Sequence, residues 1–293
     1  MRLQTGNKEL SKILIATDGS RVSEETVQYA LDLASALEYE IAAIYVSDEP
    51  LKDGEHEFSP GEAAVKYAVD EATARGISVE SFIEFGIPAV EIVKKAEEIG
   101  AKAIVLGSIG RSGVSLWLVG SVAERVIKLA YCPVIVVRKP EHEETDTRFG
   151  NMLIATDGSP ANDSAVRSGL RLASRLGMKV STISINDVRE IPRTHADEAR
   201  AELNDISKEA VAKVIHEGGL LGLNVDPIIE DGVPHKEIAE RSSEYDLVVI
   251  GTLGRTGLSE IRVGSVAEKV IRYAKCPVMV VRSSEVFAPL DPF

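Results

Sequence analysis

Two stretches of this 293-residue sequence share one spacing of glycine and serine that suits the binding of phosphate. The spacing is G-x2-G-x9-G-S, at Gly107, Gly110, Gly120 and Ser121 and again at Gly251, Gly254, Gly264 and Ser265. Glycine lets the backbone approach an anion closely, and a helix that begins at the Gly-Ser pair turns free amides toward phosphate. Arg111 and Arg255 add one positive charge to each loop. Alternatively, these glycines only make a turn and allow tight packing of a helix.

An aspartate follows an apolar segment near the start of each glycine-containing copy, in the sequence TDGS at residues 17–20 and 156–159. Asp18 and Asp157 could accept hydrogen bonds from ribose hydroxyls or the adenine amine, or help to hold a metal ion. In the alternative interpretation, each carboxylate caps nearby amides in an Asx-type turn. Both roles can hold at once.

Several classes of protein are disfavoured by motif and charge. The sequence has no GxxxxGK[ST], so it is not a P-loop nucleoside triphosphatase, and it has no GxGxxG after its first predicted strand, which argues against a dinucleotide-binding Rossmann domain. HExxH and CxxC are also absent. The net charge of −13 argues against general binding to nucleic acid or to an anionic membrane surface.

Neither a spanning helix nor an exported, disulfide-rich chain is expected. No apolar run approaches the ~20 residues of a membrane-spanning helix, and the N-terminus lacks the apolar core of a signal peptide. The expected compartment is therefore the cytoplasm. Cys132 and Cys276 precede equivalent Pro-Val pairs, and we interpret them as small buried apolar residues.

The chain is an internal duplication. Residues 107–138 and 251–282 are identical at 20 of 32 positions without gaps. We expect one domain at 1–139, a polar linker at 140–150 and a second domain at 151–293.

Apolar strands and helical segments alternate within each copy. In the first copy the pattern predicts strands at residues 12–17, 41–46, 78–85, 101–107 and 133–137, separated by four helices. Ser159 and Pro160 predict the start of the first helix in the second copy. This alternation indicates a doubly wound parallel sheet in each copy. Ligands bind such sheets beyond the carboxyl ends of the strands, so the aspartate turn and the glycine loop can meet only if the first and fourth strands are neighbours.

On these residues the chain resembles a tandem universal stress protein, over about residues 10–138 and 150–282. The motif G-x2-G-x9-G-[ST] resembles the ATP-binding version of that family. The resemblance implies two repeated doubly wound five-stranded parallel-sheet domains, adenine nucleotide alpha-hydrolase-like, with strand order 3-2-1-4-5. That order places the first and fourth strands side by side.

The resemblance also implies which residues bind ATP, and it assigns none a catalytic or metal-ligating role. The adenosine end would be lined by the end of the first strand, with Val46 or Ile185 contacting adenine through its backbone. The implied positions in the first copy are Ala16, Thr17, Asp18, Val46, Gly107, Ser108, Gly110, Arg111, Gly120, Ser121 and Val122. Those in the second copy are Ala155, Thr156, Asp157, Ile185, Gly251, Thr252, Gly254, Arg255, Gly264, Ser265 and Val266.

Two functions follow from this resemblance. The first is an ATP-binding regulatory protein of the stress response, whose ATP-bound state is recognised by an unidentified protein partner. The alternative is a slow ATP hydrolase or phosphotransferase that uses the same sites. A divalent ion, Mg²⁺ or Mn²⁺, would be recruited mainly by the phosphates. The copies differ most in the segment at residues 47–60 of the first copy and 186–194 of the second. This segment could cover the pocket, so equal affinity of the two sites does not follow from the shared motif.

The last predicted strands indicate how the two copies associate. Domains of the family that the chain resembles pair through the last strand, and the runs PVIVV and PVMVV stand at these places in the two copies. An apolar edge strand favours pairing, and the linker raises the effective concentration of the two copies. We therefore expect an internal pseudo-dimer, and homodimers of the whole chain are a further possibility.

Overall fold

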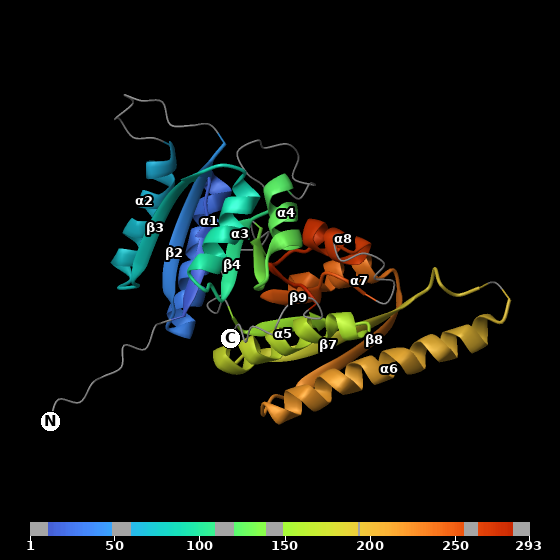
Figure 1. Cartoon of the computed structure of the whole chain (residues 1–293). Coiled ribbons are helices and arrows are strands. Elements are labelled where there is room, and N and C mark those ends of the chain that lie inside the picture. The colour runs from blue at the N-terminus through green and yellow to red at the C-terminus, as the bar shows by residue number, and fades with distance from the viewer. Residues whose placement is uncertain are drawn as a thin grey trace.

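The computed structural model describes residues 11–48, 60–108, 120–138, 149–192, 194–254 and 263–283. The first half of the chain folds as alternating strands and helices (Figure 1). Its elements are β1 (Lys12–Ala16), α1 (Arg21–Leu37), β2 (Glu40–Ser47), α2 (Pro60–Ala74), β3 (Val79–Phe85), α3 (Pro88–Glu98), β4 (Ala103–Gly107), α4 (Ser121–Leu129) and β5 (Val134–Val137). The strands predicted from the sequence are confirmed to within about two residues at each end.

The second half repeats this order. Its elements are β6 (Asn151–Ala155), the 3-10 turn η1 (Pro160–Asn162), α5 (Asp163–Leu176), β7 (Lys179–Asp187), α6 (Ala196–Leu220), β8 (Val225–Gly232), α7 (Pro234–Arg241), the 3-10 turn η2 (Ser242–Glu244), β9 (Leu247–Gly251), α8 (Ser265–Tyr273) and β10 (Val278–Val281). Its long helix α6 has 25 residues, against 15 in the equivalent α2, and runs out beyond the strands in Figure 1.

The ten strands form one sheet with the order β3-β2-β1-β4-β5-β10-β9-β6-β7-β8. Each half is parallel and has the order 3-2-1-4-5 that the family resemblance implied. The halves join through antiparallel pairing of β5 with β10, in which Met279 lies opposite Ile135. This pairing confirms the expected internal pseudo-dimer. Because the two halves run in opposite directions, their carboxyl ends lie at opposite edges of the sheet.

Alternate residues of each strand face different helices, as a two-residue period requires. Ile13 and Ile15 pack with the face that carries α1, α2, α5 and α6, whereas Leu14 packs with α3, α4, α7 and α8. Cys132 and Cys276 are buried in the second of these layers, and burial raises the pKa of both thiols to about 12. They are therefore packing residues, as predicted from the sequence.

Two arginines form hydrogen bonds between the two halves, across the β5–β10 junction. Arg138, which follows β5, donates from Nη1 to the carbonyl of Ile271 at 3.0 Å and to that of Arg272, both in the last turn of α8. Its equivalent Arg282, which follows β10, donates to the carbonyl of Leu129 at the end of α4 at 3.4 Å. A helix leaves its last carbonyls without internal partners, so these contacts satisfy helix ends from the opposite domain.

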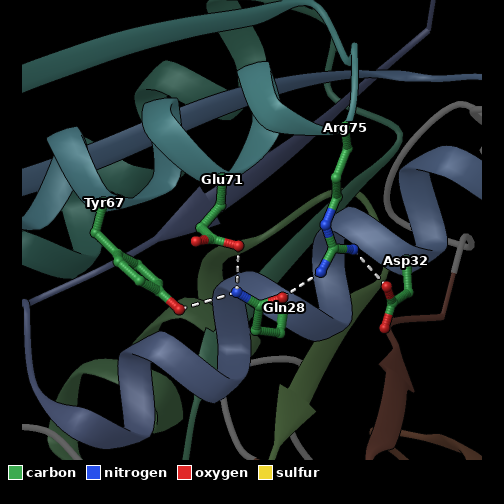
Figure 2. Close-up of polar contacts among 5 residues, drawn as sticks. All are labelled: Gln28, Asp32, Tyr67, Glu71 and Arg75. Carbon is green, nitrogen blue, oxygen red and sulfur yellow. Dashed lines mark hydrogen bonds and ion pairs between the residues drawn. The ribbon is translucent and has the colours of Figure 1, made fainter.

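Helices α1 and α2 are held together by a polar network that Figure 2 shows. The Gln28 amide donates to the Tyr67 hydroxyl and to the Glu71 carboxylate, each at 2.9 Å. The Arg75 guanidinium, just after α2, donates to the side-chain carbonyl of Gln28 and to the Asp32 carboxylate, both on α1. In the second domain an ion pair between Lys213 and Asp163, at 2.5 Å, joins α6 to α5.

One helix start differs from the sequence prediction. Ser159 and Pro160 do not open a regular α-helix, because Pro160–Asn162 form a 3-10 turn and α5 begins only at Asp163. The Ser159 hydroxyl makes no cap hydrogen bond, since it donates to Asp157 at 2.7 Å. In the first domain Ser20 does cap its helix, by accepting from the Ser23 amide.

Candidate nucleotide sites

The first and fourth strands of each half are neighbours, so the aspartate turn and the glycine motif lie at one edge of the sheet. Ala16 at the end of β1 lies opposite Leu106 of β4. In the second half Ile154 of β6 lies opposite Val249 of β9. The strand order reverses at these pairs, which is where doubly wound sheets bind their ligands.

The aspartates form Asx-type turns, which confirms one of the two interpretations made from the sequence. The Ser20 amide donates to Asp18 Oδ1 at 3.0 Å, and the Ser159 amide donates to Asp157 Oδ1 at the same distance. The intervening glycines have φ of 73° and 76°, a left-handed conformation that favours glycine. In both turns Oδ1 is thus engaged by the protein backbone.

The turn and the glycine motif approach each other in the second domain. A Cβ placed on Gly254 would lie 2.7 Å from Asp157 Oδ2, closer than real side chains come. A side chain at position 254 would therefore have to displace the Asp157 carboxylate. Of the other implied motif residues, Gly110, Arg111 and Arg255 lie outside the described residues.

The two ends of each glycine loop are joined in the same way. The Gly120 amide donates to the Ser108 carbonyl at 2.8 Å, and the Gly264 amide donates to the Thr252 carbonyl at 2.7 Å. A Cβ on Gly264 would lie only 3.0 Å from that same Thr252 oxygen. The hydrogen bond therefore sets where the following helix begins, directly beside the end of β4 or β9.

Helices α4 and α8 start at this closure and present their first amides to the sheet edge. Their caps, Gly120 and Gly264, have no side chain to bond those amides. Ser121 and Ser265 are exposed, and Val122 and Val266 follow them in the first turn. Free amides and the helix dipole together make each start a favourable place for an anion.

The second strand of each half continues past the end of the first strand. The Thr17 amide donates to the Ile44 carbonyl at 3.0 Å, and the β1–β2 register ends at this level. Alternate residues of a strand turn their backbone groups to the same side, so Val46 faces the space beyond β1. Thr156 and Ile183 repeat the contact at 2.9 Å, which gives Ile185 the equivalent place.

The sequence interpretation missed a pair of residues behind the two turns. Ser23, in the first turn of α1, is buried and donates from its hydroxyl to Asp18 Oδ1, and it accepts from the Asp18 amide at 3.1 Å. Asn162 takes its place in the second domain and is 6% exposed. A Cβ on Gly251 would lie 3.4 Å from its amide nitrogen, and its Oδ1 has no hydrogen-bond partner among the described residues. Comparison of the residues that follow the two TDGS segments could have identified this exchange.

A charged group at the end of β7 was also missed, namely Asp187, the last residue of that strand. A hydrogen bond from the Arg189 guanidinium lowers the pKa of Asp187. Nearby, at the start of α7, burial and then the charges of Lys269 and Arg189 lower the pKa of His235. In the first domain Ala89 takes the place of His235, one residue after the proline that starts each helix.

The described ranges of the chain contain neither a preformed cluster of metal ligands nor a membrane-spanning helix. They contain no group of three or more His, Cys, Asp or Glu side chains arranged to hold a metal ion. Within the same ranges, no helix combines the length and the apolar composition needed to cross a bilayer.

The comparisons with known proteins agree with this architecture. Universal stress protein MJ0531 of Methanocaldococcus jannaschii is 40% identical over 152 residues, which are 48% of this chain and 89% of that protein. Universal stress protein Rv2623 of Mycobacterium tuberculosis is 26% identical over 300 residues, covering 96% of this chain and 99% of its own. The crystal structure of a universal stress protein from Archaeoglobus fulgidus has a TM-score of 0.64 and 24% identity, over 93% of this chain and 98% of that one.

Two other similar structures contain nucleotides. One is a universal stress protein in complex with cAMP, and the other is the universal stress protein from Archaeoglobus fulgidus in complex with dAMP. Each covers 44% of this chain with a TM-score of 0.37, at 24% and 26% identity respectively. The model of the universal stress protein family itself matches residues 9–138 and again 148–282. This chain therefore belongs to the universal stress protein family and contains two copies of the family domain.

Proposed function

We propose that the chain binds two adenine nucleotides, ATP in the first place, one in each domain, and acts as a nucleotide-dependent regulator in the response to stress. The functional units are residues 1–139 and 151–293. The observation that supports this most directly is the approach of the glycine motif to the aspartate turn, where a Cβ on Gly254 would lie 2.7 Å from Asp157 Oδ2. This approach brings the glycine motif and the aspartate turn together at one edge of the sheet, so a single ligand there could contact both.

Each part of ATP has a suitable partner along this edge. The backbone edges of Val46 and Ile185 suit the donors and acceptors of adenine. The carboxylates of Asp18 and Asp157 accept from the turn amides and have acceptor capacity for a ribose hydroxyl as well. The free amides at the starts of α4 and α8 suit the phosphates, and the sequence adds Arg111 and Arg255 to the loops.

A divalent ion fits these sites only as part of the nucleotide complex. The described residues hold no group of three metal-ligating side chains, and Asp18 and Asp157 each commit one oxygen to the turn. Mg²⁺ is usually bound through one or two carboxylates together with the phosphates of the substrate. In our proposal the phosphates carry the ion, and the aspartate contacts it through water.

We propose binding and not turnover as the function. The helix amides hold the ground-state triphosphate, and an interaction that is equal in the ground and transition states does not accelerate a reaction. We therefore expect single-turnover hydrolysis well below ~1 s⁻¹, the lower end of ordinary enzyme rates. A rate near one per second that falls in a variant with unchanged ATP affinity would establish the hydrolase alternative instead.

The test of the ligand class is mass spectrometry of small molecules released from freshly purified protein by denaturation. We expect an adenine nucleotide, and we expect none from the double variant Gly110→Val, Gly254→Val prepared in the same way. The control is Gly219→Val, because a Cβ at Gly219 has open space around it. Recovery of a different ligand class, or of equal nucleotide from the double variant, would contradict the proposal.

A further inference from the structure

We propose that Arg138 and Arg282 couple the two nucleotide sites, because each fixes the helix that forms the phosphate end of the site in the opposite domain. The inference rests on the proposed function, since it concerns how those two sites regulate each other. Both arginines are positioning residues in this account, and neither contacts the nucleotide.

The contact of Arg138 lies at the back of the second site. Its Nη1 group donates to the Ile271 carbonyl at 3.0 Å and also to the Arg272 carbonyl, in the last turn of α8. These oxygens belong to a helix end whose carbonyls have no further partners within the helix. A guanidinium there also complements the negative end of the helix dipole. The first domain therefore fixes the position of α8.

The other end of α8 is the phosphate end of the second site. The helix has nine residues and begins at Ser265, directly after Gly264. A helix this short moves as one body, so a displacement at Arg272 also displaces the amides at Ser265. The Gly264 amide is at the same time held by the Thr252 carbonyl at 2.7 Å.

Arg138 is also linked to the first site through the backbone. It follows Val137, whose carbonyl accepts from the Ser108 amide at 2.9 Å. The Ser108 carbonyl in turn accepts from Gly120, at the phosphate end of the first site, at 2.8 Å. A nucleotide that orders the closure of Ser108 with Gly120 therefore orders the strand end from which Arg138 extends.

The second domain repeats this connection in the opposite direction. Thr252 donates to the Val281 carbonyl at 3.0 Å, and Arg282 follows and donates to the Leu129 carbonyl at the end of α4. That last contact is 3.4 Å long, whereas Arg138 donates to the Ile271 carbonyl at 3.0 Å and also to the Arg272 carbonyl. We expect Arg138 to carry the larger part of the coupling, because its contact is the shorter of the two. The coupling free energy itself is the same whichever site binds first.

The expected coupling is positive. Binding at the first site restrains the strand end and, through Arg138, the helix α8, so part of the ordering required at the second site has already occurred. A second ligand then binds to a protein that loses less conformational freedom. Coupling between binding sites commonly changes affinity by about 5- to 150-fold, and we expect the lower end because one residue carries most of it.

The experiment is calorimetric titration with ATP of chains that retain one or both sites. The second-site affinity should be about fivefold weaker in Gly110→Val, whose first site is disabled, than in the unmutated chain. Arg138→Ala should remove this difference, and Arg282→Ala should reduce it less. The matched control is Arg272→Ala, which removes a charge from the same helix end but leaves the backbone carbonyl to which Arg138 donates.

A second measurement does not depend on fitting two affinities. In Gly254→Val, where only the first site binds, ATP should slow hydrogen exchange in the last turn of α8, and Arg138→Ala should abolish the change. Equal second-site affinity with and without a working first site, together with unchanged exchange in α8, would overturn the coupling and leave two independent sites. Failure of the unmutated chain to bind ATP would instead overturn the proposed function, and the coupling with it.

Discussion

Next to the first site Tyr45 lies over Gly61, whereas the equivalent place beside the second site is polar. A Cβ on Gly61 would lie 2.6 Å from the Tyr45 ring, so the ring fills the space of a missing side chain. In the second domain the Ser184 hydroxyl donates to Ser207 at 3.0 Å, and a chain of hydrogen bonds continues through Asn186 to Asp231. Both arrangements connect the second strand to the helix that follows it.

This difference contrasts with the sites themselves, which the two domains preserve. The glycine loops close through bonds of 2.8 and 2.7 Å between equivalent residues, and both aspartates accept the serine amide at 3.0 Å. Backbone groups at the sheet edge determine these contacts, so few substitutions are compatible with them. The contact between the second strand and the following helix depends on side-chain volume and polarity. Here the two domains differ at both residues of the pair, with Tyr45 and Gly61 in the first domain and Ser184 and Ser207 in the second.

The largest effect is expected from a change in the preserved part of the second site. Gly254→Val places a branched side chain where even a Cβ would lie 2.7 Å from Asp157 Oδ2. We expect the second-site affinity for ATP to fall at least about hundredfold, with one site remaining per chain. Calorimetric stoichiometry measures this directly. Two remaining sites of unchanged affinity would show that the glycine motif does not form the ligand site.

A smaller loss, of stability, is expected where the domains differ. Gly61→Ser introduces the residue of the second domain and should destabilise the chain by about 1–3 kcal/mol, because the new side chain overlaps the Tyr45 ring. The double variant Gly61→Ser, Tyr45→Ser should recover most of this loss, since it reproduces the pair found in the second domain. Urea unfolding of both variants measures the interaction, and additive effects would contradict the matched exchange.

The sequence predicted most of the fold because the duplicated pattern of apolar strands and helices repeats at the level of whole elements. It also placed the glycine motifs and the aspartate turns, whose geometry follows from local residue types. It could not give the hydrogen bonds of Arg138 to α8, because they join residues 133 and 134 positions apart in sequence. The replacement of Tyr45 and Gly61 by Ser184 and Ser207 in the second domain could not be predicted for a similar reason. In each pair, one residue lies on a strand and the other on the following helix.

The polar residues behind the two turns should also behave differently. Ser23→Ala removes the donor to Asp18 Oδ1 and the acceptor for the Asp18 amide, so we expect a loss of about 1 kcal/mol. Asn162→Leu replaces a carbonyl oxygen that has no partner among the described residues, and it should leave stability within about 0.5 kcal/mol or raise it. Thermal unfolding of the two variants compares them, and equal losses would show that Asn162 also supports its turn.

The smallest effect is a pH dependence confined to the second domain. Burial lowers the pKa of His235 below 6.5 in the folded chain, so its contribution to stability is present above about pH 6.5 and is lost as the pH falls through the folded pKa. His235→Ala, which copies Ala89, should flatten the stability profile between pH 7.5 and about 5. Asp187, whose pKa is lowered from 3.8, acts below this range. An unchanged slope in urea unfolding across these pH values would contradict this.

The central claim is that each of the two domains holds one adenine nucleotide, and native mass spectrometry of the full chain titrated with ATP tests it most directly. At saturation we expect the chain to carry two nucleotides, and Gly110→Val and Gly254→Val to carry one each. The Gly219→Val control should carry two. A chain that saturates with a single nucleotide, or one that gains mass equally in the double glycine variant, would contradict the assignment of one site to each domain.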